Sequence, residues 1–354
     1  MTSGPRSPDE GALLSVQNLS TTFHTDDGEV RAVDGVSFEI NRGEVFAVVG
    51  ESGSGKSVTA MSILGLLPQP PAHIEGDGIF WKGRDLLGVD EADLRSIRGG
   101  EIAIIFQDPL TALNPVQPVG RQIGEMVRIH EKASRKAARA RAIETLDLVG
   151  IPQPDKRVDD YPHEFSGGMR QRAMIAMAIA CNPDLLIADE PTTALDVTVQ
   201  AQVLEVLLDI KDQIDSAIML ITHDLGVVAG LADRVMVMYA GRRAELGTAD
   251  ETFYRTRHPY TLGLLASLPR VDESGEDHLL PIPGQPPSLI RRPTGCAFHP
   301  RCTFAKALCS DVVPDFRVVD GASHFSACHY AEEVGEVDVA ALRAEGDAEP
   351  ELTR

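Results

Sequence analysis

The chain has 354 residues, of which 43% are hydrophobic and 24% are charged, and its formal net charge is −20. This length allows two domains, or one domain with a substantial appendage, each with a buried core. The acidic balance disfavours a nucleic-acid partner, because phosphate contacts need a basic face. No apolar run approaches the roughly 20 residues that span a bilayer, and the first residues do not resemble a secretory signal. We therefore expect a cytosolic protein whose thiols stay reduced.

The pattern along the chain alternates between strands and helices. LLSVQNLSTTF and AVDGVSFEI are typical of strands, and GEVFAVVG is typical of a buried parallel strand that feeds a loop. DLLIADE and AIMLITHD predict two more buried strands, and RVMVMYAGRRAELG predicts a hairpin. HEKASRKAARARAIETLDLVG is basic and helical in pattern. This order predicts an α/β core with a largely parallel sheet.

Shifts in composition divide the chain into segments. We expect a disordered tail over 1–12, an α/β core over 13–107 and 176–250, and a helical subdomain over 108–175. A C-terminal extension covers 251–330 and an acidic disordered tail covers 331–354, which carries eight acidic and two basic residues. Five of the thirteen residues from Pro281 to Pro293 are proline, which predicts a stiff connector.

GESGSGKS, from Gly50 to Ser57, matches the phosphate-loop pattern and lies between a predicted strand and a predicted helix. Glycines let backbone N–H groups turn towards a phosphate, and the helix N-terminus adds its dipole. Lys56 can reach the β- and γ-phosphates, and the Ser57 hydroxyl can bind Mg²⁺. The predicted nucleotide contacts from this loop are Gly50, Glu51, Ser52, Gly53, Ser54, Gly55, Lys56, Ser57 and Val58.

Two further motifs support an ATPase. LLIADE ends in Asp189, which would hold Mg²⁺, and Glu190, which would polarise the attacking water. FSGGMRQR places Ser166, Gly167 and Gly168 at the start of a second helix. One nucleotide cannot use both anion-binding helix ends of the same chain, so a dimer is predicted in which each chain caps the γ-phosphate held by the other.

In this order, over residues 13 to about 250, the motifs resemble those of ATP-binding-cassette (ABC) transporter ATPase subunits. The resemblance implies a P-loop NTPase with a RecA-like core, an antiparallel β subdomain and an inserted helical subdomain. It also implies that Phe23 stacks on adenine, that Asp196 belongs to the D-loop and that His223 senses the γ-phosphate. Gln107 would be the Q-loop glutamine and a third group at Mg²⁺. Lys56, Gln107, Glu190 and His223 would then form the catalytic set. The signature has Phe165 and Met169 where the common form has Leu and Gln, which leaves the Ser-Gly-Gly contact intact.

FQDPLTALNPV, FSGGMRQRAMIAMAIACNPDLLIADEPTTALDVTVQAQ and HPYTLGLLASLPR resemble the dipeptide and oligopeptide importer ATPases. That family implies a second, different ATPase subunit, two membrane permeases and an extracytoplasmic binding protein, with this chain at the cytoplasmic face of the membrane. Nickel importers share these motifs and remain an alternative. A non-transport ABC ATPase is disfavoured, because the chain has neither a second cassette nor a long inserted coiled coil. A regulatory iron–sulfur protein with a degenerate nucleotide fold is disfavoured by the intact Glu190 and His223.

Four of the five cysteines, Cys296, Cys302, Cys309 and Cys328, lie in the last sixth of the chain. Disulfides are disfavoured in the cytosol. Structural Zn²⁺ is an alternative, although its cysteines usually lie closer in sequence, and the nearby residues His299, His324 and His329 also suit it. Four loosely spaced thiolates suit a [4Fe–4S] cluster, which some peptide-importer ATPases carry in the same tail. Its predicted role is structural, in a small cysteine-rich metal-binding region. The remaining cysteine, Cys181, is predicted to be a buried core thiol.

Overall fold

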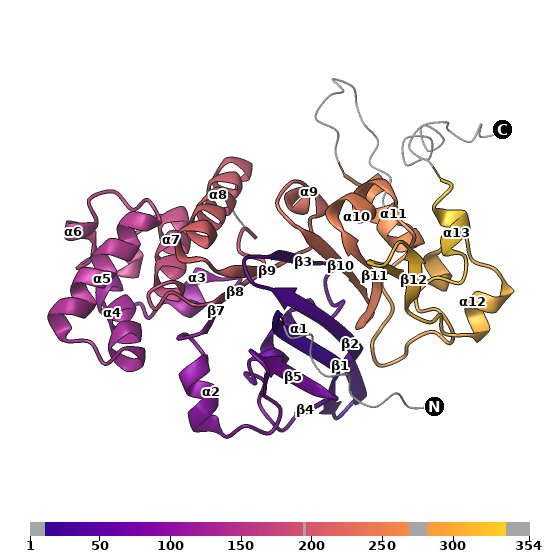
Figure 1. Cartoon of the computed structure of the whole chain (residues 1–354), viewed down its shortest axis with the longest axis horizontal. Coiled ribbons are helices and arrows are strands. Elements are labelled where there is room, and N and C mark those ends of the chain that lie inside the picture. The colour runs from indigo at the N-terminus through magenta and orange to yellow at the C-terminus, as the bar shows by residue number, and fades with distance from the viewer. Residues whose placement is uncertain (1–10, 194–195, 269–281, 338–354) are drawn as a thin grey trace.

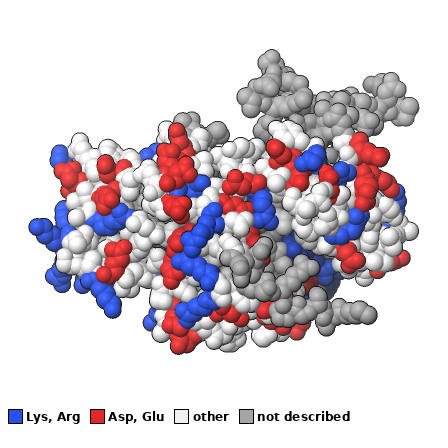
Figure 2. Space-filling model, viewed as in Figure 1, with Lys and Arg blue, Asp and Glu red and all other residues white. Residues whose placement is uncertain are grey.

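The computed structural model describes residues 11–193, 196–268 and 282–337. It has two sheets, a group of helices at one end and the cysteine-containing segment at the opposite end (Figure 1). Acidic and basic side chains mix over the face seen in Figure 2, and basic ones gather at the helical end. Within the described residues, no helix is both long and apolar enough to cross a membrane.

The smaller sheet is antiparallel and holds the first two predicted strands. β1 (Ala12–Thr25) pairs with β2 (Gly28–Asn41), with a tight turn between Thr25 and Gly28. Three shorter strands, which the sequence pattern did not reveal, complete this sheet: β4 (Ala72–Glu75), β5 (Gly78–Trp81) and β6 (Arg84–Asp85). This sheet is the antiparallel β subdomain that the resemblance implied.

The larger sheet has eight strands in the order β12-β13-β11-β10-β3-β9-β8-β7. The part from β10 to the edge strand β7 is parallel, as predicted. Those parallel strands are β3 (Val45–Val49), β7 (Ile102–Ile105), β8 (Leu185–Asp189), β9 (Ala217–Thr222) and β10 (Arg234–Tyr239). β11 (Arg242–Thr248) turns back antiparallel on β10 and so confirms the predicted hairpin.

The apolar runs in these strands are explained by burial on both faces of the sheet. In β3, Val45, Ala47 and Val49 pack into one core, while Phe46 and Val48 pack into a second core that is shared with β1 and β2. β9 and β10 alternate in the same way. A strand buried on both faces carries apolar residues at every position, which is why the pattern reads as a continuous run rather than an alternation.

The helical subdomain packs against the first of these cores. α5 (Arg135–Leu148) confirms the predicted basic helix, and Ser134 begins it by accepting a hydrogen bond from the backbone N–H of Ala137. The other helices of this part are α3 (Pro109–Ala112), α4 (Val119–His130), α6 (Pro154–Arg157), η1 (Pro162–Glu164) and α7 (Gly167–Ala178). The remaining helices that border the large sheet are α1 (Lys56–Ile63), α2 (Glu91–Ile97), α8 (Val197–Ile214), α9 (Leu225–Val228), α10 (Ala249–Tyr254) and α11 (Pro259–Ala266).

The C-terminal extension continues the large sheet instead of forming a domain apart. After an irregular connector over residues 282–293 it forms η2 (His299–Arg301), α12 (Ala307–Asp311), β12 (Arg317–Asp320), β13 (His324–Ser326) and α13 (Ala331–Val334). β13 pairs antiparallel with β11, and Phe298 joins the core of the helical side.

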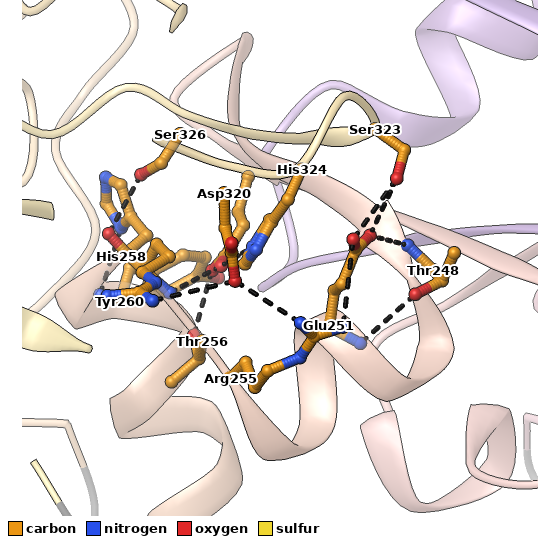
Figure 3. A network of polar contacts seen from close by, with 12 residues as sticks. Thr248, Glu251, Arg255, Thr256, His258, Tyr260, Asp320, Ser323, His324 and Ser326 are labelled. Atoms are coloured by element: carbon orange, nitrogen blue, oxygen red, sulfur yellow. Dashed lines mark hydrogen bonds and ion pairs between the residues drawn. The ribbon is translucent and has the colours of Figure 1, made fainter. Parts of the chain in front are cut away.

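A buried polar network joins the extension to the core (Figure 3). Glu245 of β11 is fully buried and accepts three hydrogen bonds, from Thr256 Oγ1 at 2.9 Å, from the backbone N–H of Arg257 at 2.6 Å and from His324 Nε2 at 2.7 Å. Near it, Ser323 donates to the Glu251 carboxylate. These contacts hold β13 against β11 from the side chains as well as from the backbone.

One predicted boundary and the predicted burial of Cys181 need correction. The acidic tail was expected to begin at residue 331, but Ala331–Val334 form α13, and Ala331 and Val334 are fully buried. Cys181, expected in the core, lies just beyond the end of α7 and is only partly buried. The expected tails over 1–10 and 338–354, and Pro281 of the connector, lie outside the described residues.

Candidate nucleotide site

The phosphate loop lines an open cavity of about 660 Å³ at the carboxyl end of β3. Its lining includes residues 51–58 of the loop, together with Gln107, Glu190, His223 and Pro286. Parallel strands bring the residues after their carboxyl ends to one side of a sheet, and ligands bind at that side. The structure therefore brings together the loop and the three separate residues that the sequence placed at one catalytic centre.

Glycines are required where the loop passes close to other backbone. Gly55 has φ of 101°, and a Cβ atom there would lie 2.4 Å from the carbonyl oxygen of Ala32. At Gly50, a Cβ atom would lie 2.3 Å from the carbonyl oxygen of Met238. Larger residues cannot be accommodated at either position without displacing backbone. The tight loop leads directly into α1, whose N-terminus faces the cavity formed by the loop.

Lys56 is almost fully buried at the start of α1. Its ammonium group donates hydrogen bonds to the carbonyl oxygens of Gly50 at 2.7 Å and Glu51 at 3.1 Å. It lies 3.9 Å from Glu190 Oε1. Burial lowers the pKa of Lys56, and the nearby carboxylates of Glu190 and Asp189 oppose that effect. A buried cation at a helix N-terminus suits a polyanionic ligand.

Asp189 and Ser57 form the pair that the sequence assigned to Mg²⁺. Ser57 Oγ donates to Asp189 Oδ1 at 2.9 Å, and Asp189 is buried at the end of β8. Burial raises the pKa of Asp189, while the Ser57 hydroxyl and the Lys56 charge act in the opposite direction. A hydroxyl and a carboxylate are oxygen donors of the kind that Mg²⁺ prefers, so these residues fit that ion.

Glu190 is the point where the catalytic candidates meet. Gln107 Nε2 donates to Glu190 Oε2 at 3.1 Å, and His223 Nδ1 lies 3.4 Å from the same oxygen. Thr193 Oγ1 also donates to this oxygen, at 2.9 Å. The φ of Glu190 is 47°, which is uncommon for a residue with a side chain and is typical of functional sites. Sequence reasoning missed Thr193 and Pro286; Thr193 lies in the same DEPTT run and was open to prediction, whereas Pro286 had no signal.

The signature residues are far less enclosed than the phosphate loop. Ser166 begins α7 by accepting a hydrogen bond from the backbone N–H of Met169 at 3.3 Å, and Ser166 and Gly167 are exposed. Neither they nor Gly168 line the cavity of their own chain as the structure describes it. Phe23 is half-buried on β1, and Asp196 caps α8; both also lie outside that lining.

The four C-terminal cysteines are gathered in the extension as free thiols. Burial raises the pKa of Cys302 to about 11 and that of Cys328 to about 12, and the other cysteines of the group add to the shift. The backbone N–H of Cys296 donates to the carbonyl oxygen of Cys309 at 2.8 Å. In the part of the chain that is described, however, no group of three or more His, Cys, Asp or Glu side chains is close enough to hold a metal ion.

The three histidines weighed as zinc ligands are engaged elsewhere. His324 is fully buried against Glu245 in the network of Figure 3. His299 Nδ1 lies 2.9 Å from the carbonyl oxygen of Cys296, and His329 Nε2 lies 2.9 Å from that of Val312. These contacts give the histidines structural roles in the extension.

The parallel part of the large sheet carries a phosphate loop and an acidic strand end, and a glutamine and a histidine converge on that acidic end. This combination defines an ABC-type ATPase. Solved structures agree. A dimeric bacterial ABC transporter cassette, MJ0796, has a TM-score of 0.59 and 26% identity over 67% of this chain and 98% of that chain. The same cassette in a dimeric post-hydrolysis state bound to ADP and Pi has a TM-score of 0.60 at 25% identity, with the same coverage.

Residues 33–193 match the ABC transporter family, and residues 244–309 match the C-terminal region of oligopeptide/dipeptide transporters. The oligopeptide transport ATP-binding protein OppD of Bacillus subtilis is 55% identical over 87% of this chain and 86% of its own length. The dipeptide transport ATP-binding protein DppD of the same organism is 54% identical, covering 89% and 94%. OppD of Escherichia coli is 51% identical, covering 86% and 89%. The chain belongs to this family of peptide-transport ATP-binding proteins.

Proposed function

We propose that this chain is the ATP-hydrolysing subunit of an ABC importer that powers uptake of dipeptides or oligopeptides. The observation that carries the proposal is the convergence of Lys56, Gln107 and His223 on Glu190 beside the phosphate loop. The relatives are named for oligopeptide and dipeptide transport, which favours peptide over the nickel alternative.

In this proposal each residue of the ATP site has a defined task. Lys56 and the loop N–H groups bind the β- and γ-phosphates. Ser57, Gln107 and Asp189 would hold Mg²⁺, which would neutralise phosphate charge when bound. Glu190 accepts a proton from the attacking water, and His223 contacts the γ-phosphate. The hydrogen bonds from Gln107 and Thr193 fix the orientation of the Glu190 carboxylate. Phe23 stacks on adenine, and Asp196 lies in the D-loop beside the partner.

The complete ATP site needs a second ATPase subunit. Ser166, Gly167 and Gly168 lie outside their own cavity, and Ser166 and Gly167 are exposed. A helix N-terminus that presents N–H groups to solvent can bind the γ-phosphate of a facing chain. The similar cassette MJ0796 is a dimer in its solved structure, which supports a site shared between two chains. The proposed partner is a different ATPase subunit of the same importer. The pair docks beneath two permeases at the cytoplasmic face of the membrane. The permeases receive peptide from an extracytoplasmic binding protein.

We also propose that Cys296, Cys302, Cys309 and Cys328 bind a metal centre, with a [4Fe–4S] cluster favoured over Zn²⁺. All four thiols lie in the extension, and each of Cys296, Cys302 and Cys309 raises the pKa of Cys328, although no three of the described side chains are yet close enough to hold an ion. All four cysteines are free thiols, and four cysteine thiolates are the usual ligands of a [4Fe–4S] cluster. The centre would tie together parts of the extension that share few apolar contacts. Metal analysis and a visible absorbance spectrum of protein purified without oxygen test this proposal; protein free of iron and zinc would contradict it.

Reconstitution of the importer tests the transport function. The chain is expected to co-purify with two permeases and the second ATPase, and peptide-loaded binding protein is expected to raise ATP hydrolysis in proteoliposomes. The Lys56→Ala variant, assembled in the same way, serves as the inactive control. Stimulation by nickel-loaded but not by peptide-loaded binding protein would contradict the peptide assignment.

A further inference from the structure

The phosphate loop is held from outside the cassette by an arginine of the C-terminal extension. Arg301, at the end of η2, is 7% exposed and pairs with both carboxylate oxygens of Glu51, the second residue of the loop. Arg301 Nη1 lies 2.6 Å from Glu51 Oε2, and Nη2 lies 2.9 Å from Oε1. This two-pronged geometry is the strongest kind of arginine–carboxylate contact.

Both partners are further restrained by groups around them. Arg301 Nε donates to the carbonyl oxygen of Pro283 at 2.9 Å, and Nη1 donates to the Tyr239 hydroxyl at 3.3 Å. The backbone N–H of Glu51 donates to the hydroxyl of Tyr260, a fully buried residue of α11, at 2.7 Å. Tyr260 therefore holds the backbone of Glu51, and Arg301 holds its side chain. Both of these residues lie outside the segment that matches the ABC transporter family.

The charge of Glu51 makes this contact relevant to ATP. A carboxylate within a loop that binds a triphosphate carries charge of the same sign as the ligand, and the two repel each other in a partly buried site. Among the described residues, the ion pair with Arg301 is the only one that Glu51 makes. Arg301 thus neutralises an acidic residue at the rim of the phosphate cavity, where Pro286 of the connector also contributes to the lining.

We propose that Arg301 is a positioning residue for ATP, through which the C-terminal extension fixes the phosphate loop and neutralises Glu51. The inference rests on the proposed ATP hydrolysis and adds to it a group that touches neither the nucleotide nor the reacting atoms. The extension then takes part in ATP binding, beyond any role in attaching the subunit to a partner.

Equilibrium binding of ATP to the full chain tests the proposal. Arg301→Met leaves the Glu51 charge without its partner, so we expect ATP to bind about 10- to 100-fold more weakly. ADP, which carries less charge, is expected to lose less affinity than ATP. Adding Glu51→Gln to Arg301→Met removes the repulsion and is expected to restore most of the affinity. A purely structural role for Arg301 predicts no such rescue.

Each outcome is decisive. Equal ATP affinity in the wild type and in Arg301→Met, or equal impairment in the single and double variants, would overturn the proposal. If Arg301→Met does not fold, Arg301→Lys can replace it, because lysine keeps the charge and loses the two-pronged contact. We expect Arg301→Lys to bind ATP several-fold more weakly, and Glu51→Gln should again restore the affinity. A wild-type chain that does not bind ATP would refute the proposed ATPase function itself, which separates the two failures.

Discussion

The cassette and the C-terminal extension are held together by different forces. In the cassette, β3, β9 and β10 are buried on both faces between two apolar cores, and the polar residues of the ATP site lie beyond the ends of such strands. The extension adds Phe298 to one of these cores, and polar contacts of Glu245 in β11 and of Arg301 also hold it to the cassette. Polar residues of the cassette therefore serve activity, and those that join the extension to it serve attachment, with Arg301 also neutralising Glu51 of the phosphate loop. Substitutions at the catalytic centre should change hydrolysis with little change in stability, whereas substitution of Glu245 should change stability first.

The largest expected effect is on hydrolysis, from a change in the cassette alone. Glu190→Gln keeps the size of the side chain and removes the proposed proton acceptor, so hydrolysis should fall about 10²- to 10⁴-fold while ATP binding is retained. The free energy of unfolding should change little, which sharpens the comparison. Single-turnover hydrolysis in the assembled importer measures the effect. A rate close to the wild-type rate would refute the role of Glu190.

A second change in the cassette should act only through the partner chain. A Cβ atom at Gly167 would meet nothing within 4 Å in its own chain, so Gly167→Asp fits the isolated subunit. The new carboxylate would face the γ-phosphate held by the partner, and we expect hydrolysis by the assembled pair to fall about 10²-fold. ATP binding to the isolated subunit should be unchanged. Gly167→Ala, which adds no charge, is the matched control. If Gly167→Asp weakens ATP binding to the isolated subunit as much as it slows hydrolysis by the assembled pair, the two-chain site is contradicted.

Where β11 of the cassette joins the extension, the expected effect is on stability. Glu245→Ala leaves the three hydrogen-bond donors around it, one of them on His324, without their acceptor and should weaken attachment of the extension by about 3 kcal/mol. In Glu245→Ala, hydrogen exchange of the backbone amides of residues 317–326 should accelerate. The fluorescence of Trp81, in the antiparallel sheet, should stay unchanged because the cassette stays folded. Asp93→Ala removes an exposed ion pair with Arg84 and serves as a control with less than about 1 kcal/mol expected. Equal exchange in Glu245→Ala and wild type would break the comparison.

The smallest effect is a pH dependence at the junction of the two regions. Burial lowers the pKa of His258 from 6.5 to about 4, although the Glu245 carboxylate acts in the opposite direction. Between these values the unfolded chain binds a proton that the folded chain does not, so the free energy of unfolding decreases as the pH falls from about 6.5 towards 4. The expected loss is about 2 kcal/mol between pH 6.5 and 5. Urea unfolding at several pH values measures it. His258→Asn keeps a side chain that can cap α11 and should flatten the dependence of the free energy of unfolding on pH. If the dependence is unchanged in this variant, other titrating groups cause it.

The difference between the apolar strands of the cassette and the polar contacts that hold the extension also explains what could be predicted from sequence. Continuous apolar runs such as Val45–Val49 predicted the parallel strands, and the spacing around Lys56 and Glu190 predicted a site that the structure brings together. β12 and β13 were missed, because strands of three or four residues held by polar contacts leave no apolar pattern. The contact between Arg301 and Glu51 joins residues 250 positions apart, and neither shows a local signal for the other.

The pairing of β13 with β11 has a consequence for shortened forms of this protein. A chain cut after the hairpin of β10 and β11 would leave one side of β11 with unpaired N–H and C=O groups. Such a free strand edge is a template for pairing with another polypeptide, and natural proteins cover it. The extension therefore acts as a cover against aggregation, and a truncated cassette should assemble into insoluble species through that exposed strand.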